Sequence, residues 1–251
     1  MSHPVFDISG RTALVTGSSR GIGRALAQGL HDAGCTVVVH GRDAAAAERA
    51  AAELPGAHHV AFDVVDADAI ERGIAAAQDA VGPLDILVNN AGIQHRVPML
   101  ELAEADWRRV VDTNLTGAFL VARAVAGGMI ERGRGKIVNV ASLQADLARP
   151  GIGAYAAAKG GVKMLTRSMC AEWGPAGVQA NAIGPGYFET DLTRALVEDE
   201  RFSSWVRGRT PAGRWGRVEE LVGTLLFLVS PAADYVNGQI VYVDGGMASV
   251  V

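Results

Sequence analysis

The sequence predicts an α/β protein whose seven parallel strands form one doubly wound sheet, with helices on both faces. Two observations predict this fold class. Short β-branched runs alternate with Ala-rich stretches of helical period along the chain. Most of the strand runs are also apolar at both alternating sets of positions, which is typical of parallel strands that are buried on both faces.

The expected elements follow one another without a break. Strands are expected at residues 12–16, 36–40, 58–62, 84–89, 135–141, 178–183 and 239–243. Helices are expected at residues 21–33, 43–54, 66–81, 104–132 and 154–173. No Pro/Ser-rich linker, low-complexity tract or repeat divides the chain, so we expect a single domain over residues 1–251.

The longest expected irregular stretch follows the sixth strand. It covers about residues 186–216 and contains Pro211 and Gly213. In an open parallel sheet, the ligand crevice lies beyond the carboxyl ends of the strands. A long segment at this position is therefore expected to form a lid over a substrate.

Composition argues against several classes of protein. The formal net charge is −4, which gives no electrostatic reason to expect a nucleic-acid or anionic membrane partner. The start of the chain lacks the pattern of a signal peptide, and the apolar stretch at residues 221–229 is far shorter than a membrane span. We therefore expect a cytoplasmic protein.

Cysteine and histidine give no sign of a disulfide or a metal site. Cys35 and Cys170 lie far apart in the chain and are expected to be free thiols. His58 and His59 point to opposite faces of one strand, and His95 has no neighbouring ligand in the sequence. No metal is expected.

A glycine cluster, Thr16 to Gly23, joins the first strand to the first helix. Glycines at such a turn let the backbone approach a pyrophosphate, whose charge is stabilised by free amides at the helix start. The GxxxGxG spacing alone is a weak signal, but its place after the first strand of a βαβ unit indicates a dinucleotide site. The expected contacts come from Gly17, Ser19, Arg20, Gly21, Ile22 and Gly23.

The end of the second strand bears on the choice between NAD and NADP. Gly41 stands where an NAD-preferring protein places a carboxylate for the adenosine ribose. Arg42, together with Arg20, can instead donate to a 2′-phosphate. NADP(H) is therefore favoured and NAD(H) stays possible. The alternative is that Arg42 is only an exposed loop cation. His40 is expected to pack at the strand end rather than to contact a phosphate.

Several motifs together resemble the short-chain dehydrogenase/reductase family of the classical type, over almost the whole chain. In chain order they are Thr16-Gly17-x-x-x-Gly21-x-Gly23, Asp63, Asn89-Asn90-Ala91-Gly92, Asn114, Ser142, Tyr155-x-x-x-Lys159, and Pro185-Gly186 followed by Thr190. The resemblance implies a Rossmann-type fold and a homotetramer built through residues 114–132 and 154–173.

The resemblance also implies cofactor contacts beyond the glycine cluster. Adenine contacts are implied for Asp63 and Val64, and contact with the nicotinamide carboxamide is implied for Thr190. The other implied cofactor residues are Asn90, Ala91, Gly92, Tyr155, Lys159, Pro185 and Gly186.

The expected proton-transfer group is Tyr155. Lys159 lies four residues later, so both side chains lie on one face of a helix. A nearby ammonium and a positively charged nicotinamide favour the phenolate and bring its pKa closer to neutrality. Ser142 is expected to stabilise the reacting oxygen, and the resemblance implies that Asn114 holds Lys159 through water. Alternatively, Lys159 merely covers the ring, Ser142 begins a turn and Asn114 caps a helix.

Within the family, the closer resemblance is to the gluconate 5-dehydrogenases, also called 5-ketogluconate reductases. The shared stretches are residues 89–96, 141–144, 184–188, 209–216 and 243–247. A sugar acid needs a cation and several neutral polar groups. Arg96 is expected to bind the carboxylate and Gln144 a hydroxyl, unless Arg96 forms an ion pair and Gln144 stabilises a loop. Tyr187, Phe188, Trp205 and Trp215 either shield the reaction or pack beneath the lid.

Other functions stay open at this point. The first is reduction of a 3-oxoacyl thioester, or of another sugar acid or polyol, because such enzymes share the Tyr/Lys pair. The second is a non-catalytic dinucleotide-binding protein. The presence of all four residues Asn114, Ser142, Tyr155 and Lys159 opposes the second alternative.

Overall fold

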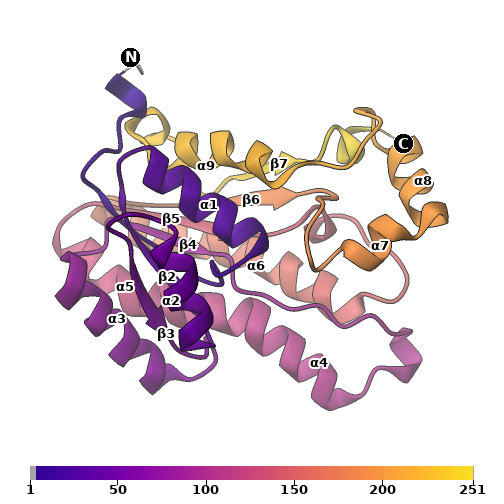
Figure 1. Ribbon diagram of the computed structural model, residues 1–251, viewed down its shortest axis with the longest axis horizontal. Helices are drawn as coiled ribbons and strands as arrows, with labels where there is room; N and C mark the ends of the chain where they lie inside the picture. Colours follow the sequence, from indigo (N-terminus) through magenta and orange to yellow (C-terminus); the bar gives the residue numbers. More distant parts are fainter. Residues whose placement is uncertain (1–3, 251) are drawn as a thin grey trace.

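The computed structural model describes residues 4–250 and has three layers (Figure 1). Seven parallel strands form one sheet in the order β3-β2-β1-β4-β5-β6-β7. The strands are β1 (Thr12–Val15), β2 (Thr36–Gly41), β3 (His58–Ala61), β4 (Ile86–Asn89), β5 (Gly135–Val140), β6 (Val178–Pro185) and β7 (Ile240–Val243). The predicted fold class is confirmed, and all seven predicted strands are present.

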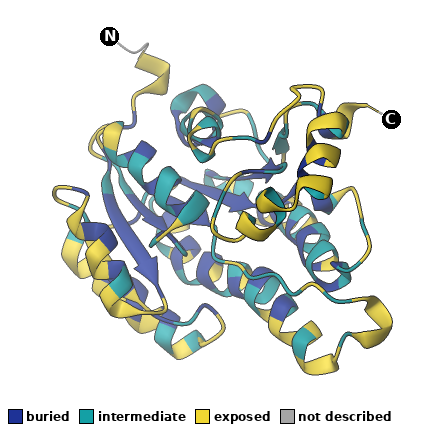
Figure 2. Ribbon diagram, turned by 45° about the vertical axis from the view of Figure 1, so that its right-hand side comes forward, coloured by how far each residue is buried: buried dark blue, intermediate teal, exposed yellow. Residues whose placement is uncertain are grey.

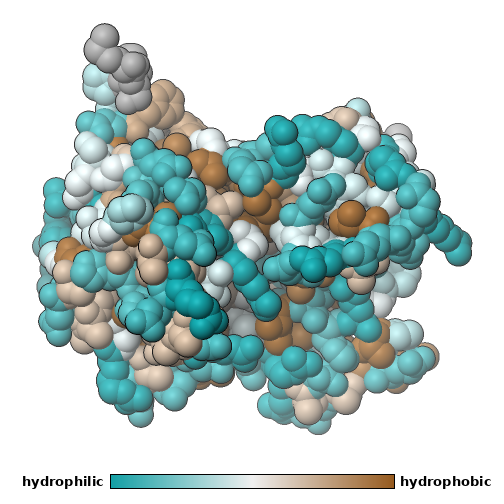
Figure 3. All heavy atoms as spheres, viewed as in Figure 1, coloured by the Kyte–Doolittle hydropathy of each residue, from teal (hydrophilic) through white to brown (hydrophobic). Residues whose placement is uncertain are grey.

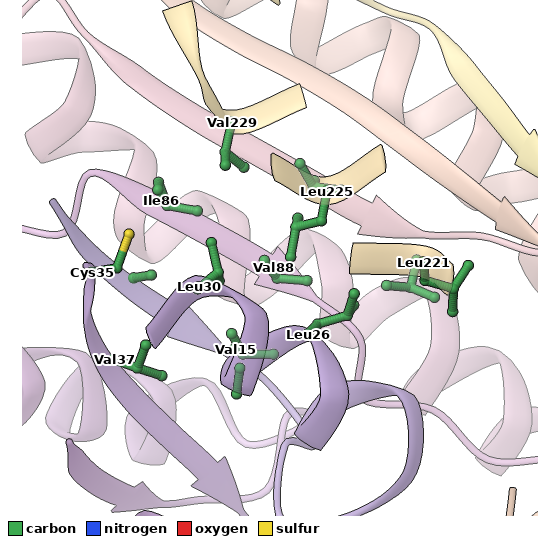
Figure 4. Close-up of a cluster of buried hydrophobic side chains, with 14 of the residues drawn as sticks. Val15, Leu26, Leu30, Cys35, Val37, Ile86, Val88, Leu221, Leu225 and Val229 are labelled. Carbon is green, nitrogen blue, oxygen red and sulfur yellow. The ribbon is translucent and has the colours of Figure 1, made fainter. Parts of the chain in front are cut away.

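Helices cover both faces of the sheet. One face carries α1 (Gly21–Asp32), α2 (Ala44–Ala52) and α9 (Val222–Val229), and the other carries α3 (Ala67–Val81), α5 (Gly117–Glu131) and α6 (Gly153–Trp173). Val15 and Val88 from the sheet, Leu26 and Leu30 from α1, and Leu225 from α9 meet in one of the two main cores (Figure 4). The strands at the centre of the sheet are buried while the outer helix faces are exposed (Figure 2).

The sheet order places a crevice at its middle. The chain winds outward from β1 through β2 to β3, then returns to the other side of β1 at β4. Loops after β1 and β4 therefore leave in opposite directions, and ligands of such sheets bind in the gap between them. The segments that carry the predicted site residues all follow the carboxyl ends of strands.

One predicted helix differs in detail. The long helix expected at residues 104–132 is α4 (Glu104–Val111) and α5 joined by a π-helical turn at Asp112–Thr116. A π-turn inserts one residue into the helical repeat and is frequent at functional sites. Asn114, one of the predicted site residues, lies inside this turn.

The segment at residues 186–216 is more regular than expected. It contains α7 (Arg194–Glu198) and α8 (Glu200–Arg209). The Asp199 side chain accepts hydrogen bonds from the amides of Arg201 and Phe202 and so caps α8. The prediction of an irregular stretch was wrong. It rested on the prolines and glycines near the two ends of the segment, and these residues say nothing about the capped helix between them. Its role as a lid stays a prediction.

By length and composition, the helical stretch Glu104–Glu131 is apolar enough to cross a membrane. Core helices of water-soluble proteins also meet this criterion. Here α5 packs against β4, β5 and α3, with Val121, Val125 and Met129 buried in the second main core. Its apolar side is therefore used within the fold.

Candidate active site

The glycine loop between β1 and α1 has the shape that a close-approaching ligand needs. Gly17 and Gly21 have left-handed backbone conformations, with φ of +63° and +56°. A Cβ atom at Gly23 would lie 2.3 Å from the carbonyl oxygen of Gly17, so no larger residue fits there. Arg20 precedes α1 and makes no side-chain cap, which leaves the first amides of the helix available to an anion.

The chain after β4 fixes this loop. The Asn90 side-chain amide donates to the carbonyl oxygens of Thr16 and Gly17, at 2.9 and 3.0 Å. The Thr16 hydroxyl accepts hydrogen bonds from the main-chain amides of Asn90 and Ala91, both at 3.0 Å. Asn90 and Ala91 therefore hold the glycine loop in place, and their contacts with a cofactor stay predictions.

Two arginines border the same loop. Arg20 and Arg42 are both exposed, and neither guanidinium makes a hydrogen bond or ion pair within residues 4–250. Gly41 beside Arg42 is buried, and a Cβ at Gly41 would lie 3.5 Å from the Ser19 hydroxyl. No carboxylate thus stands at residue 41, and two unpaired cations flank the end of β2.

The predicted adenine contacts follow β3. The Asp63 carboxylate accepts a hydrogen bond from the Val65 amide at 3.2 Å and forms a turn. The Val64 side chain is buried against Gly117, where a Cβ would lie 2.8 Å from Val64 Cγ2. An adenine contact by Val64 would therefore come from its backbone, and both contacts stay predictions.

Asn114 is buried and joins the π-turn to the loop after β4. Its Oδ1 accepts from the Ile93 amide at 2.7 Å, and its Nδ2 donates to the Ile93 carbonyl at 2.8 Å. A Cβ at Gly92 would lie 3.2 Å from the same Oδ1, so Gly92 keeps this approach open. The alternative that Asn114 caps α5 is wrong, because the side chain bonds to Ile93 and the helix start has no side-chain cap.

The four predicted catalytic residues come from three elements around the end of β5. Tyr155 and Lys159 lie on one face of α6, with the Lys159 ammonium 5.8 Å from the centre of the Tyr155 ring. Lys159 donates to the carbonyl oxygen of Val140 at 2.6 Å. Ser142 follows β5 and lies close enough to Tyr155 for its hydroxyl to act to lower the pKa of the phenol. Its hydroxyl also accepts from the Gln144 amide at 3.1 Å, so Ser142 begins a turn as well.

The electrostatics of this cluster differ from the expectation. Burial raises the pKa of Tyr155, while hydrogen bonding with Ser142 and the positive charge of Arg96 act to lower it. Lys159 is not among these influences, and burial lowers its own pKa to about 8. Lys159 alone is therefore not among the groups that lower the Tyr155 pKa, and the expected joint effect of its ammonium and a positively charged nicotinamide stays a prediction.

The lid contains the predicted aromatic residues. The Tyr187 ring makes edge contacts with Phe202, Trp205 and Trp215, at centroid distances of 5.6–5.8 Å. Trp215 is buried and its indole donates to the Ser203 hydroxyl at 2.8 Å, whereas Trp205 is half exposed. Packing beneath the lid is thus the observed role of most of these rings.

The start of the lid is held by threonines. Pro185 ends β6, and the Gly186 amide donates to the Val243 carbonyl at 2.9 Å. The Thr190 hydroxyl and amide both lie 3.0 Å from the Thr193 hydroxyl.

Thr190 also lines a cavity of about 670 Å³ that reaches Gly21 and the exposed face of α1. The surface is hollowed between the half of the molecule with α1 and the half with α7 (Figure 3).

Arg96 and Gln144 both lie near the Tyr155 cluster. The Arg96 guanidinium donates to Gln94 at 2.8 Å and approaches the Leu192 carbonyl at 3.5 Å, and it pairs with no carboxylate in the described chain. Gln144 is buried, and its side-chain oxygen has no hydrogen-bond partner among residues 4–250. An ion pair of Arg96 is thus absent among residues 4–250, and there a buried acceptor at Gln144 stays free.

Sequence reasoning missed Arg149. Its positive charge acts on both Arg96 and Tyr187, which places it in the same cluster. Its guanidinium lies 5.1 Å from the centre of the Phe202 ring, so it connects the loop after β5 to the lid. Arg149 follows Ser142 by seven residues, and the argument that selected Arg96, a cation after a strand end, applies equally to Arg149.

Comparison with known proteins covers the whole chain. A family model described as enoyl-(acyl carrier protein) reductase matches residues 17–248. The chain is 53% identical to gluconate 5-dehydrogenase of Gluconobacter oxydans, over 98% of each protein. It is 46% identical to 5-keto-D-gluconate 5-reductase of Escherichia coli K12, over 99% of this chain and 100% of that one. The chain belongs to the short-chain dehydrogenase/reductase family.

A solved member of the short-chain dehydrogenase/reductase family has nearly the same structure. It is a gluconate 5-dehydrogenase from Burkholderia cenocepacia in complex with NADP and tartrate, 50% identical, with a TM-score of 0.97 over 99% of both chains. Membership makes this protein an oxidoreductase and confirms the resemblance that the motifs carried. The residues present also fit a dinucleotide, because Gly23 lets α1 pack closely against the Gly17 carbonyl and the Asn90 side chain, and no side chain caps the first amides of α1.

Proposed function

We propose that the protein interconverts D-gluconate and 5-keto-D-gluconate with NADP(H), using Tyr155 as general acid and base. The full-length identity of 53% to a gluconate 5-dehydrogenase carries this proposal. The unpaired cations beside the glycine loop and the cations beside Tyr155 agree with it.

The glycine loop and two arginines support NADP(H). The amides at the start of α1 can donate hydrogen bonds to a pyrophosphate, and the Arg20 and Arg42 guanidiniums can donate to a 2′-phosphate. A carboxylate at residue 41 would repel that phosphate, and Gly41 removes this obstacle. When bound, NADPH supplies the hydride for reduction.

Tyr155 supplies the proton. Its phenol holds a proton that passes to the carbonyl oxygen of the substrate during reduction, and the Ser142 hydroxyl donates a hydrogen bond to the same oxygen. Lys159 donates to the Val140 carbonyl and lies one helical turn after Tyr155, where its charge would act on the phenolate together with that of the oxidised nicotinamide. In the direction of oxidation, the phenolate takes the proton from the alcohol.

Two cations near Tyr155 support an anionic substrate. Burial and the charge of Arg149 lower the pKa of Arg96, which means that the two guanidiniums repel each other. A carboxylate placed between them would relieve this repulsion and form charge-assisted hydrogen bonds. The free oxygen of Gln144 and the buried Tyr187 hydroxyl, which makes no well-aligned hydrogen bond, are suited to substrate hydroxyls.

A substrate panel tests the proposal. The purified protein is given 5-keto-D-gluconate, the neutral ketose D-fructose or a 3-oxoacyl thioester, each with NADPH and with NADH. We expect the fastest turnover with 5-keto-D-gluconate and NADPH. Faster turnover of the thioester would contradict the proposed substrate and make the protein a 3-oxoacyl-thioester reductase. NADPH binding without any turnover would support a non-catalytic protein.

A further inference from the structure

His40 lies beneath the glycine loop and has no part in the proposed chemistry. It is the penultimate residue of β2 and its side chain is 1% exposed. Its ring packs against the Phe62 ring, with centroids 4.1 Å apart. This agrees with the expectation that His40 packs at a strand end, but both of its ring nitrogens also have polar partners.

These partners fix the protonation state of the imidazole. The Gly17 amide lies 3.0 Å from His40 Nδ1, and because an amide only donates, Nδ1 must be the acceptor without a proton. The Phe62 carbonyl oxygen lies 3.1 Å from Nε2, and because a carbonyl only accepts, Nε2 must carry the hydrogen. His40 is therefore neutral and holds a single tautomer.

The hydrogen bond to His40 is one half of a clamp on Gly17. On the other side of the same residue, the Gly17 carbonyl accepts from the Asn90 side chain at 3.0 Å. The main chains of Ser18 and His40 also pair, through the Ser18 amide and the His40 carbonyl at 2.9 Å. Gly17 is thus held from β2 and from β4 in its left-handed conformation.

We propose that His40 is a positioning residue for the dinucleotide, which holds the glycine loop in its binding conformation by accepting the Gly17 amide. This inference rests on the proposed binding of NADP(H) to that loop. His40 acts through Gly17 and does not contact the cofactor. Its loss therefore changes cofactor affinity and leaves the catalytic step of the saturated enzyme unchanged.

Protonation would release the clamp. A cationic imidazole carries hydrogens on both nitrogens, so Nδ1 would face the Gly17 amide donor to donor. Burial lowers the pKa of His40 to about 4, opposed by the hydrogen bond to Phe62 and by the charge of Asp63. Asp63 is the charged group that acts on the ring from the end of β3, and the contacting loop residues Gly17 and Ser18 carry no charge. Affinity is therefore full at neutral pH and falls as the pH approaches 4.

Two amide substitutions separate the two hydrogen bonds. In His40→Asn, Oδ1 takes the place of Nδ1 and can still accept from Gly17. In His40→Gln, the amide reaches the place of Nε2 and leaves the part-buried Gly17 amide without an acceptor. An unpaired buried donor weakens cofactor binding by roughly tenfold or more. We expect the dissociation constant for NADPH to rise by that factor in His40→Gln and by much less in His40→Asn.

NADPH fluorescence titration measures these constants, and steady-state kinetics measure kcat at saturating cofactor. The inference is supported if His40→Gln raises the constant while kcat changes less than about twofold, and if wild-type affinity falls below pH 5. It is overturned if Asn and Gln weaken NADPH binding equally, if neither weakens it, or if wild-type affinity is constant from pH 7 to 4. Failure of the wild type to bind either nicotinamide at pH 7 would instead refute the proposed function.

Circular dichroism at each pH shows whether the chain stays folded. The pH series is repeated with His40→Asn, whose amide does not titrate, so that a loss of affinity common to both proteins is assigned to groups other than the imidazole. His59→Asn and His59→Gln, at an exposed position on β3, are the matched controls and should leave the dissociation constant unchanged.

Discussion

The Lys159 ammonium donates a hydrogen bond to the carbonyl oxygen of Val140, 2.6 Å away. The side chain is 5% exposed, and the described chain places no carboxylate within ion-pair distance of it. A buried lysine without a counter-ion costs folding free energy whenever it is charged. This cost gives Lys159 an effect on stability that is separate from its proposed effect on Tyr155.

The stability effect depends on pH. Burial lowers the pKa of Lys159 to about 8 from its ordinary value of 10.5. Below pH 8 both the folded and unfolded states hold the proton, so the folded state bears the full cost of the charge. Between pH 8 and 10.5 the unfolded state binds more protons, so the free energy of unfolding rises with pH.

We expect Lys159→Met to raise the free energy of unfolding at pH 7, by roughly 1–3 kcal/mol. The advantage should shrink toward pH 9.5, where the wild-type lysine is neutral in the folded state. Denaturant titrations of the cofactor-free protein at both pH values measure it. A gain of equal size at both pH values would show that the charge is not its cause. The same variant should lose most of its reductase activity.

Tyr155→Phe removes the proposed proton donor and keeps the ring. We expect kcat for the reduction of 5-keto-D-gluconate to fall by about 10²–10⁴-fold, as removal of a general acid typically causes. NADPH binding should be retained, since the phenol contributes little to holding the cofactor. Steady-state kinetics measure the change in kcat, and fluorescence titration measures NADPH binding separately. Tyr235→Phe, at a fully exposed tyrosine, is the matched control, and near-normal turnover of Tyr155→Phe would refute the assignment.

The strands and the shared helix face of Tyr155 and Lys159 could be predicted from the sequence because each depends on local spacing. Short β-branched runs marked the strands, and a separation of four residues put Tyr155 and Lys159 on one helix face. The order of motifs then identified the family. These features depend only on residues that are close together in the sequence or on the order of short motifs along it.

Features that depend on distant contacts were missed. The π-turn around Asn114 follows from a pairing with Ile93, and α8 depends on a cap and on aromatic packing under the lid. The net pKa of Tyr155 depends on its burial, which spacing does not reveal. The homotetramer and the cytoplasmic location stay predictions.

Arg42→Ala tests the preference for NADP(H). Loss of a charge-assisted hydrogen bond to a 2′-phosphate should raise the dissociation constant for NADPH by about 10–100-fold. NADH lacks that phosphate, so its constant should change little. Arg49→Ala removes a second exposed arginine nearby, on α2, and controls for loss of general positive charge. Equal losses with both nicotinamides in Arg42→Ala would contradict the proposed contact.

Arg149→Gln tests the second cation near Tyr155. The Arg149 guanidinium lies 5.1 Å from the Phe202 ring centre, and its charge acts on Arg96 and Tyr187. If it binds the substrate carboxylate, its loss should raise KM for 5-keto-D-gluconate by about tenfold, the worth of one hydrogen bond to a charged group. The KM for NADPH should stay the same, because Arg149 lies on the substrate side of the cluster.

The control for this variant is Arg123→Gln, because Arg123 also lies over a phenylalanine ring, Phe119, at 5.4 Å, but on α5. A general effect of losing a cation from an aromatic face would appear in both variants. An effect on the carboxylate alone would appear only in Arg149→Gln, and only with the acid. If Arg149→Gln changed the KM of a neutral ketose as much as that of the keto acid, Arg149 would be positioning the lid through Phe202 and not binding the substrate's charge.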